Sequence, residues 1–168
     1  MLSYIRKNFV FRSRDGIVLM ESLIAITIAT VGLLGMFSLL SRSLSLTRVI
    51  SDRYIAANLG GEGIEIVKNI IDNNILAARP WNQGLSSGSY EVAHNSGLSP
   101  NLGRRLFFSP TSGFYDYEGA GRQTNFWREV RVERIGSDEI RVNSIVKWIS
   151  RGGGEFEVNL EDHFFNWQ

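Results

Sequence analysis

Few side chains in this sequence are suited to chemistry, and one of them stands in an unusual place. Glu21 is the single charged residue in the apolar run 17–40. A carboxylate well inside a bilayer costs roughly 2.5–3.5 kcal/mol, so a glutamate at that depth predicts a functional role and a cationic partner. The alternative is that Glu21 lies close enough to the cytoplasmic interface to stay solvated. Both interpretations place the apolar run in a membrane.

The other reactive residue types form no catalytic constellation. The sequence has no cysteine and only two histidines, His94 and His163, which excludes thiolate nucleophiles, disulfides and multi-histidine metal clusters. It has no phosphate-binding loop, dinucleotide-binding glycine motif, zinc-protease motif or serine nucleophile elbow. The segment 116–119 has too few spaced oxygen ligands for a calcium loop. We therefore predict no enzymatic activity, no catalytic residues, no metal and no cofactor.

Two charged clusters allow other functions. Glu62 and Glu65 could form a paired-carboxylate site, but their position favours a solvated helix face. Arg128, Arg131 and Arg134 share one expected strand and could contact phosphates, yet acidic residues alternate with them. Because the chain carries 18 Lys and Arg against 17 Asp and Glu, a charge-mixed, solvated strand is favoured over a phosphate track. Nucleic acid is not an expected partner.

The apolar run is long enough to cross a membrane. At about 1.5 Å per residue, a helix over 17–40 spans roughly 36 Å, more than the hydrocarbon core of about 30 Å. Residues 1–16 carry four basic side chains and one acidic side chain. The positive-inside tendency therefore keeps them cytoplasmic and sends the rest of the chain across. The run is too long for a secretory h-region and lacks a small-residue cleavage site at its end, so a retained anchor is favoured.

The residues before Glu21 complete a processing motif. A basic leader ends at Gly16, four apolar residues follow, and Glu21 is the fifth residue after the glycine. This pattern resembles the class III signal peptide of type IV pilins and type II secretion pseudopilins. The resemblance implies cleavage after Gly16 by a prepilin peptidase, N-methylation at Ile17, and an assembly role for Glu21. Such mature chains most often begin with Phe, and this chain departs from the family by beginning with Ile17.

The motif also has a physical rationale. Cleavage between Gly16 and Ile17 creates an α-amino cation four residues before Glu21. In a staggered stack of helices, the amine of one subunit can neutralise the Glu21 carboxylate of its neighbour, which removes the desolvation cost of both charges and sets the register. Glycine suits the cleavage site because a backbone without Cβ can lie extended in a narrow protease cleft.

An amphipathic pattern extends the helix beyond the membrane run. Apolar residues recur at mostly three- or four-residue steps from Leu44 to Ile75, and no proline occurs before Pro80. One helix from 17 to about 78 is therefore predicted. The glycines of the stretch 60–63 cost up to about 1 kcal/mol each relative to alanine, so melting or bending is expected there. The surrounding segment 57–69 resembles the Glu-Gly-Ile-Glu stretch of minor, I-type pilin-like proteins.

After Pro80 the period changes from helical to alternating. Three strong strands in an antiparallel meander are predicted at 126–135, 140–148 and 156–161. Weaker strands are predicted beside or within a long loop from 94 to 124, at 89–95, 104–109 and 113–117. In the last strong strand, Phe156, Val158 and Leu160 alternate with polar residues, so one sheet face must be covered. The outer half of the helix is the only long apolar stripe that can cover it.

These patterns predict an α+β protein with a long N-terminal helix whose second half packs on a small antiparallel β-sheet head. The resemblance implies the same pilin-like fold. Three divisions are expected: a cytoplasmic leader at 1–16 that is removed on processing, a helix at 17–78 with its transmembrane part at 17–40, and an extracytoplasmic β-rich head at 79–168.

The resemblance implies a minor pilin or pseudopilin, which is a structural and assembly subunit of a type IV pilus or secretion filament. Its expected partners are other pilin or pseudopilin subunits, a prepilin peptidase and methylase, and an inner-membrane assembly platform. It is expected first in the inner membrane, with a cytoplasmic N-terminus, and then in a filament. The alternative is an uncleaved single-pass membrane protein whose β-domain is a sensor or ligand-binding module.

Overall fold

The protein combines one long helix with one antiparallel sheet. The computed structural model describes residues 14–93, 97–118, 121–150 and 153–166. Helix α1 (Arg14–Leu76) has no break over its whole length. The chain divides into two compact units, residues 1–47 and 48–168. The described part of the first unit is helix alone, and the second unit contains the rest of α1 and the sheet.

The end of α1 is fixed by a cap and by the turn that follows it. The N–H of Arg79 donates to the carbonyl of Asn74 at 2.8 Å, and the N–H of Ala78 donates to that of Ile75 at 3.0 Å. Ala78 takes the left-handed conformation, with φ of 52°, that this type of C-cap requires. The buried Asn74 amide then donates to the carbonyls of Trp81 and Gln83 at 3.2 and 2.8 Å. The helix therefore ends close to the predicted boundary, before Pro80.

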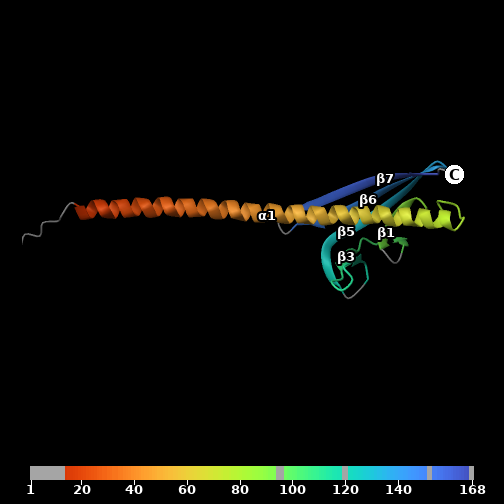
Figure 1. Cartoon of the computed structure of the whole chain (residues 1–168), viewed down its shortest axis with the longest axis horizontal. Helices are drawn as coiled ribbons and strands as arrows, with labels where there is room; N and C mark the ends of the chain where they lie inside the picture. The colour runs from red at the N-terminus through yellow and green to blue at the C-terminus, as the bar shows by residue number, and fades with distance from the viewer. Residues whose placement is uncertain (1–13, 94–96, 119–120, 151–152, 167–168) are drawn as a thin grey trace, which may run out of the picture. The chain divides into compact units, whose positions relative to one another are not determined.

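The sheet has seven strands among the described residues. They are β1 (Gly88–Ala93), β2 (Gly97–Pro100), β3 (Arg105–Phe108), β4 (Tyr115–Asp116), β5 (Arg122–Ile135), β6 (Glu139–Ile149) and β7 (Glu155–Phe165). The predicted meander is confirmed as β5, β6 and β7, with Val132 opposite Val142 and Val146 opposite Val158. Figure 1 shows the second half of α1 running along these strands.

Strand β5 is paired on both edges. One edge pairs with β6 over ten residues, from Phe126 to Ile135. The other edge is shared, because β1 pairs with β5 around Val130 and β3 pairs with β5 from Arg122 to Trp127. The β1–β2 and β3–β4 hairpins therefore pair with different parts of the same edge of β5. Side chains must fill the gap that is left between the two hairpins.

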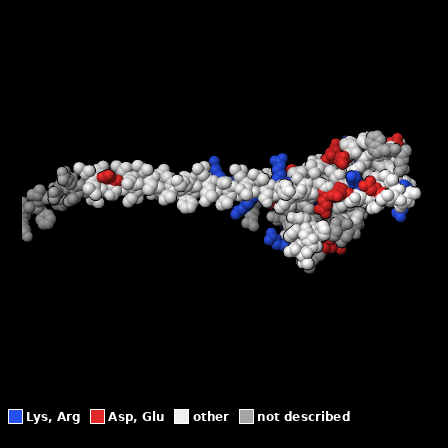
Figure 2. Space-filling view, in the orientation of Figure 1, with Lys and Arg blue, Asp and Glu red and all other residues white. Residues whose placement is uncertain are grey.

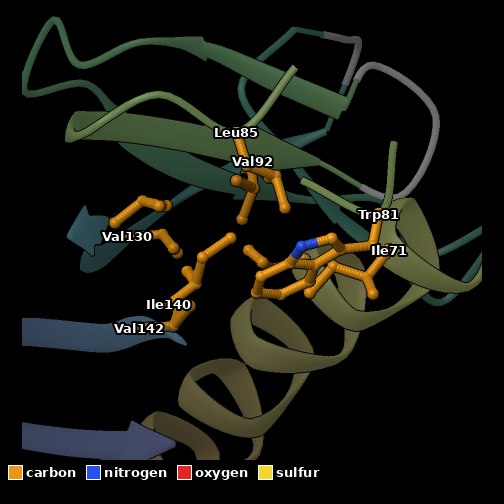
Figure 3. Close-up of a cluster of buried hydrophobic side chains, with 9 residues drawn as sticks. Ile71, Trp81, Leu85, Val92, Val130, Ile140 and Val142 are labelled. Atoms are coloured by element: carbon orange, nitrogen blue, oxygen red, sulfur yellow. The ribbon is translucent and has the colours of Figure 1, made fainter. Parts of the chain in front are cut away.

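The core lies between α1 and one face of the sheet. Its larger cluster packs two helix residues, Val67 and Ile71, against four fully buried residues of β5 and β6 (Figure 3): Val130, Val132, Ile140 and Val142. Trp81 and Leu85, from the segment after the helix, close this cluster. A second cluster joins Ala56 and Leu59 to residues that include Phe126, Val146 and Trp148. The predicted fold class, a helix whose second half packs on an antiparallel sheet, is confirmed.

The glycine-rich stretch of α1 is where the helix approaches the sheet most closely. A Cβ on Gly60 would lie 3.0 Å from a side-chain methyl of Leu160, and a Cβ on Gly63 would clash with the Ser144 hydroxyl. The expected melting at 60–63 is wrong, because the helix continues through it. The sheet can lie this close to the helix only because glycine has no side chain. The resulting close packing offsets the low helix propensity of these glycines.

The region predicted as a long loop holds more structure than expected. Strand β2 lies inside the stretch 94–124 and pairs with β1, with Val92 opposite Leu98. The last strand also runs four residues beyond its predicted end at Glu161. His94, at the start of the expected loop, lies outside the described residues, and His163 lies near the end of β7.

Candidate functional site

Among the described residues, the longest run of exposed apolar side chains is the part of α1 from Ile17 to Leu40. Every side chain of this segment is exposed, including Leu19 at 71% and Phe37 at 67%. Figure 2 shows it as an almost uncharged surface interrupted by one acidic group. By length and composition, α1 is a helix that can cross a membrane, and its most apolar stretch buries nothing within the protein. A surface of this size requires an apolar environment or a partner.

The hydroxyl groups of this segment are satisfied within the helix. Ser22 donates to the carbonyl of Val18 at 2.8 Å, and Thr27 donates to that of Leu23 at 2.7 Å. Thr30 makes the same contact one turn later. Because helical backbone groups are also paired internally, these residues add little cost in a medium without water. Glu21 is the exception, since it has no hydrogen bond or ion pair with any described residue.

The helix brings the three predicted processing and assembly residues together. Gly16, Ile17 and Glu21 all lie in the first turns of α1, which begins at Arg14. Residues four apart share one helix face, so an amino group created at Ile17 lies one turn from the Glu21 carboxylate. Gly16 is itself helical in this structure.

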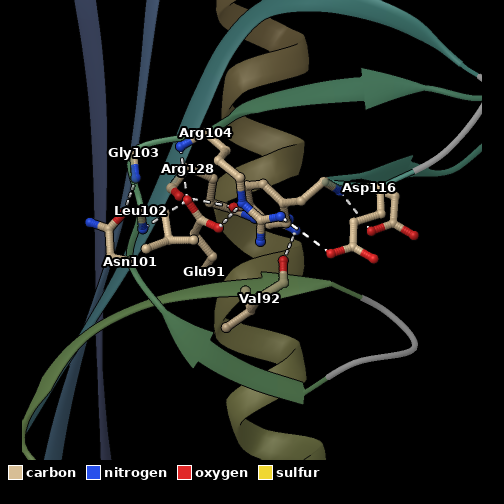
Figure 4. A network of polar contacts seen from close by, with 10 residues as sticks. Glu91, Val92, Asn101, Leu102, Gly103, Arg104, Asp116 and Arg128 are labelled. Carbon is tan, nitrogen blue, oxygen red and sulfur yellow. Dashed lines mark hydrogen bonds and ion pairs between the residues drawn. The ribbon is translucent and has the colours of Figure 1, made fainter.

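A second polar site fills the space between the two hairpins (Figure 4). Glu91 on β1 is only 1% exposed and binds the segment that leads into β3. Its carboxylate accepts hydrogen bonds from the backbone N–H groups of Leu102 and Arg104, at 3.1 and 2.8 Å. The guanidinium of Arg104 adds a charged contact of 2.7 Å, and this hydrogen bond raises the pKa of Arg104. Glu91 thus ties β1 to the entry of β3.

Arg128 is the centre of this polar site. It is 2% exposed and donates hydrogen bonds to the carbonyls of Leu59 in α1, at 3.1 Å, and of Val92 in β1. It also pairs with Glu62 of α1 at 2.9 Å. The hydroxyl of Tyr117 donates to the backbone carbonyl of Arg128 at 2.9 Å, and burial raises the pKa of Tyr117. These contacts hold the helix, β1 and β5 together.

The predicted solvated arginine strand is therefore wrong for Arg128. Arg131 is exposed and pairs with Glu129 at 2.9 Å, as a charge-mixed face predicts. Arg134 instead donates to the carbonyls of Leu85 and Asn82. The signal that was missed is the alternation of the strand, which places Arg128 on the same face as its buried apolar neighbours.

The two glutamates of α1 that could form a carboxylate pair, Glu62 and Glu65, lie in different environments. Glu62 is half-buried and held by Arg128, so its expected solvation is wrong, whereas Glu65 is exposed. The two do not form a paired-carboxylate site. Nothing in the sequence indicates that Glu91 is buried, because its hydrogen-bond donors belong to a segment that only the tertiary fold brings close.

The face of the sheet away from α1 carries a groove of about 520 Å³. Trp127, Ile145 and Ile149 give it apolar walls, and Glu129 and Lys147 give it charge. The guanidinium of Arg105 stacks over the Trp127 ring, 4.5 Å from its centre. Partial burial acts to raise the pKa of Glu129, but hydrogen bonds from Ser89 and Arg131 bring it below its usual value. The volume is in the range typical of small-ligand sites.

His163 forms a small charged cluster near the end of β7. Its ring nitrogens lie 2.6 Å from a carboxylate oxygen of Glu139 and 3.2 Å from one of Glu161. These hydrogen bonds raise the pKa of His163. Among the described residues, no group of His, Asp and Glu has a geometry that could hold a metal ion.

The polar groups of the second unit thus serve mainly to hold strands and helix together. No protein-family model matches the chain, and neither a curated protein nor a solved structure matches it. The fold and the exposed apolar helix define the class: an α+β protein with one N-terminal helix long and apolar enough to cross a membrane and a β-sheet head.

Proposed function

We propose that this chain is a pilin-like assembly subunit, either a minor pilin of a type IV pilus or a pseudopilin of a related secretion filament. It is made as a precursor with a cytoplasmic leader, cut after Gly16 by a prepilin peptidase, and methylated at Ile17. It then enters a filament through the apolar half of α1. Its partners are other pilin or pseudopilin subunits, the peptidase and methylase, and an inner-membrane assembly platform.

One observation carries this proposal. The segment 17–40 is an exposed apolar helix whose only charge, Glu21, lies one turn from the amine that cleavage after Gly16 creates. In the membrane each of these charges is costly when alone, and pairing between neighbouring subunits reduces that cost. The second half of α1 lies in the core of the head, so the same helix serves both assembly and the fold of the head.

A second candidate function is supported by the groove on the helix-free face. In this candidate the chain stays uncleaved as a single-pass membrane protein, and the head binds a small ligand beside Trp127. The volume of the groove and its mixture of apolar and charged walls suit such a role. In that case Glu21 has no partner and only weakens the anchor.

Intact-mass measurement and N-terminal sequencing separate these candidates. The chain is expressed in membranes with an active prepilin peptidase, and separately with a peptidase inactivated in its catalytic residues. We expect a new terminus at Ile17, carrying one extra methyl group, only with the active enzyme. A chain that still begins at Met1 under active peptidase supports the uncleaved anchor. A cut beyond Leu40 contradicts both membrane functions, because it releases the head.

A further inference from the structure

The last strand of the head pairs with another strand on one edge only, within the part of the chain that the structure describes. β7 pairs with β6 over its whole length, from Glu155 opposite Ile149 to Phe165 opposite Glu139. Among the described residues no strand pairs with its other edge, and Figure 1 shows β7 at the margin of the sheet. The outer edge of a strand presents backbone N–H and C=O groups in a row, which can pair with a strand from another chain.

The two faces of β7 differ in chemistry. Leu160 meets α1 at Gly60, and Phe156 stacks on Trp148 with ring centres 5.6 Å apart, so the even-numbered side chains lie toward the helix. Phe156 remains 40% exposed. The odd-numbered side chains point the other way, and Glu157 there lines the groove and pairs with Lys147 at 3.5 Å.

The side of β7 away from the helix carries three glutamates, with His163 near its end. Glu155, Glu157 and Glu161 are exposed along it. Contacts with Asn143 and His163 lower the pKa of Glu161, which keeps it charged. An added strand places its own side chains directly opposite these residues, about 5 Å away, where opposite charges attract and like charges repel.

We propose that the β7 edge is a docking surface for an extended segment of another polypeptide in which Lys or Arg alternates with apolar residues. The basic side chains of that segment face Glu155, Glu157 and Glu161. Its apolar side chains face Phe156 and cover the exposed part of that ring. The backbone supplies hydrogen bonds, and the alternation selects the partner.

Two central registers of self-pairing between copies of this edge are unfavourable. Antiparallel pairing of β7 with itself around Val158 places Glu155 opposite Glu161, and pairing around Asn159 places Glu157 opposite Glu161. Each arrangement sets like charges face to face, which is destabilising. In these registers the edge discourages self-association and favours a partner of opposite charge. This inference goes beyond the proposed function, because it does not depend on cleavage or on assembly through α1.

Peptide binding to the full-length protein in a neutral detergent tests the proposal. The probe is a fluorescein-labelled peptide, matched in length to β7, that alternates lysine and valine. One control peptide has the same composition in two blocks, and another carries N-methyl groups that prevent backbone pairing. We expect saturable binding of the alternating peptide, weakened by salt, and little binding of either control. Equal binding of all three peptides overturns the proposal, because charge alone then explains it.

A charge exchange tests the location. The double variant Glu155→Lys with Glu157→Lys should bind the lysine peptide about tenfold more weakly and should now bind a glutamate–valine peptide. Glu65→Lys, on an exposed position of α1, is the matched control and should leave both affinities unchanged. Hydrogen exchange should show slower amides in β7 when the lysine peptide is bound. Unchanged peptide preference in the double variant, or protection confined to other strands, overturns the proposal.

Discussion

The guanidinium of Arg128 in β5 donates a hydrogen bond of 3.1 Å to the carbonyl of Leu59 in α1, a residue 69 positions earlier in the chain. The same side chain reaches Val92 in β1 and Glu62 in α1. It lies where β1 and β3 diverge from β5, so one buried cation replaces the pairing that the sheet lacks at this point. The position of the helix on the sheet therefore depends on a polar contact as well as on apolar packing.

Replacing Arg128 with methionine should destabilise the head strongly. The substitution keeps apolar bulk but removes the guanidinium that donates to the carbonyls of Leu59 and Val92 and pairs with Glu62, and we expect a loss of about 3 kcal/mol in the free energy of unfolding. Urea titration followed by tryptophan fluorescence measures it, since Trp81 and Trp148 are buried. Arg131→Met, in an exposed ion pair on the same strand, should change the stability by less than about 1 kcal/mol. Equal losses in the two variants would contradict the assigned role of Arg128.

Gly61 and Gly63, two residues apart in α1, should respond in opposite directions to substitution by alanine. Gly63→Ala forces a methyl group against the Ser144 hydroxyl and Val130, so we expect a loss of about 1–3 kcal/mol in the free energy of unfolding. Gly61→Ala meets no atom within 4 Å and should stabilise the helix by up to about 1 kcal/mol. Urea titration of both variants measures the difference. A stabilising Gly63→Ala would show that the helix does not lie this close to β6.

Stability should fall as the pH rises through the folded pKa of His163. Glu139 and Glu161 raise that pKa above the unfolded value of about 6.5. The contribution is therefore complete below about pH 6.5 and is lost as the pH rises through the raised folded value. Urea midpoints measured across this range should decrease, and the decrease should be smaller in His163→Gln. An NMR titration of the His163 ring gives the folded pKa directly, and a value below 6.5 would contradict the geometry of the cluster.

Under the proposed function, Glu21→Gln should separate processing from assembly. Cleavage after Gly16 should continue, because the peptidase site is retained, whereas incorporation into filaments should fall steeply because the amine of a neighbouring subunit loses its counter-charge. Sheared filament fractions, compared with the processed pool in the membrane, measure the two steps. Ser22→Ala is the matched control, since it removes only a hydrogen bond within the helix. Normal incorporation of Glu21→Gln would favour the uncleaved membrane protein.

Periodicity in the sequence predicted the main elements because each is long and repeats its pattern many times. The helical stripe and the alternation in β5, β6 and β7 gave the fold class, and Phe156, Val158 and Leu160 gave the covered face. Short strands were harder, since β2 has four residues in a region rich in turn-forming residues.

The errors concern residues whose role depends on partners far away in the sequence. Gly60 and Gly63 weaken an isolated helix, and only the adjacent sheet makes them favourable. Arg128 was assigned to solvent by its residue type, although its place in the alternation pointed to the core. Burial of a charged group is permitted only when the fold supplies its hydrogen bonds, and this information is not local.

The unbroken course of α1 into the core has a mechanical consequence. A force along the helix axis acts on the contacts between helix and sheet. Two of these are the packing of Gly63 against Ser144 and the hydrogen bond from Arg128 to the Leu59 carbonyl. Such a load must slide the helix along the strands and break these contacts together, rather than peel them one at a time. The mechanical resistance is then set by the rate at which these helix–sheet contacts unfold. Arg128 is the contact whose loss should lower the rupture force most.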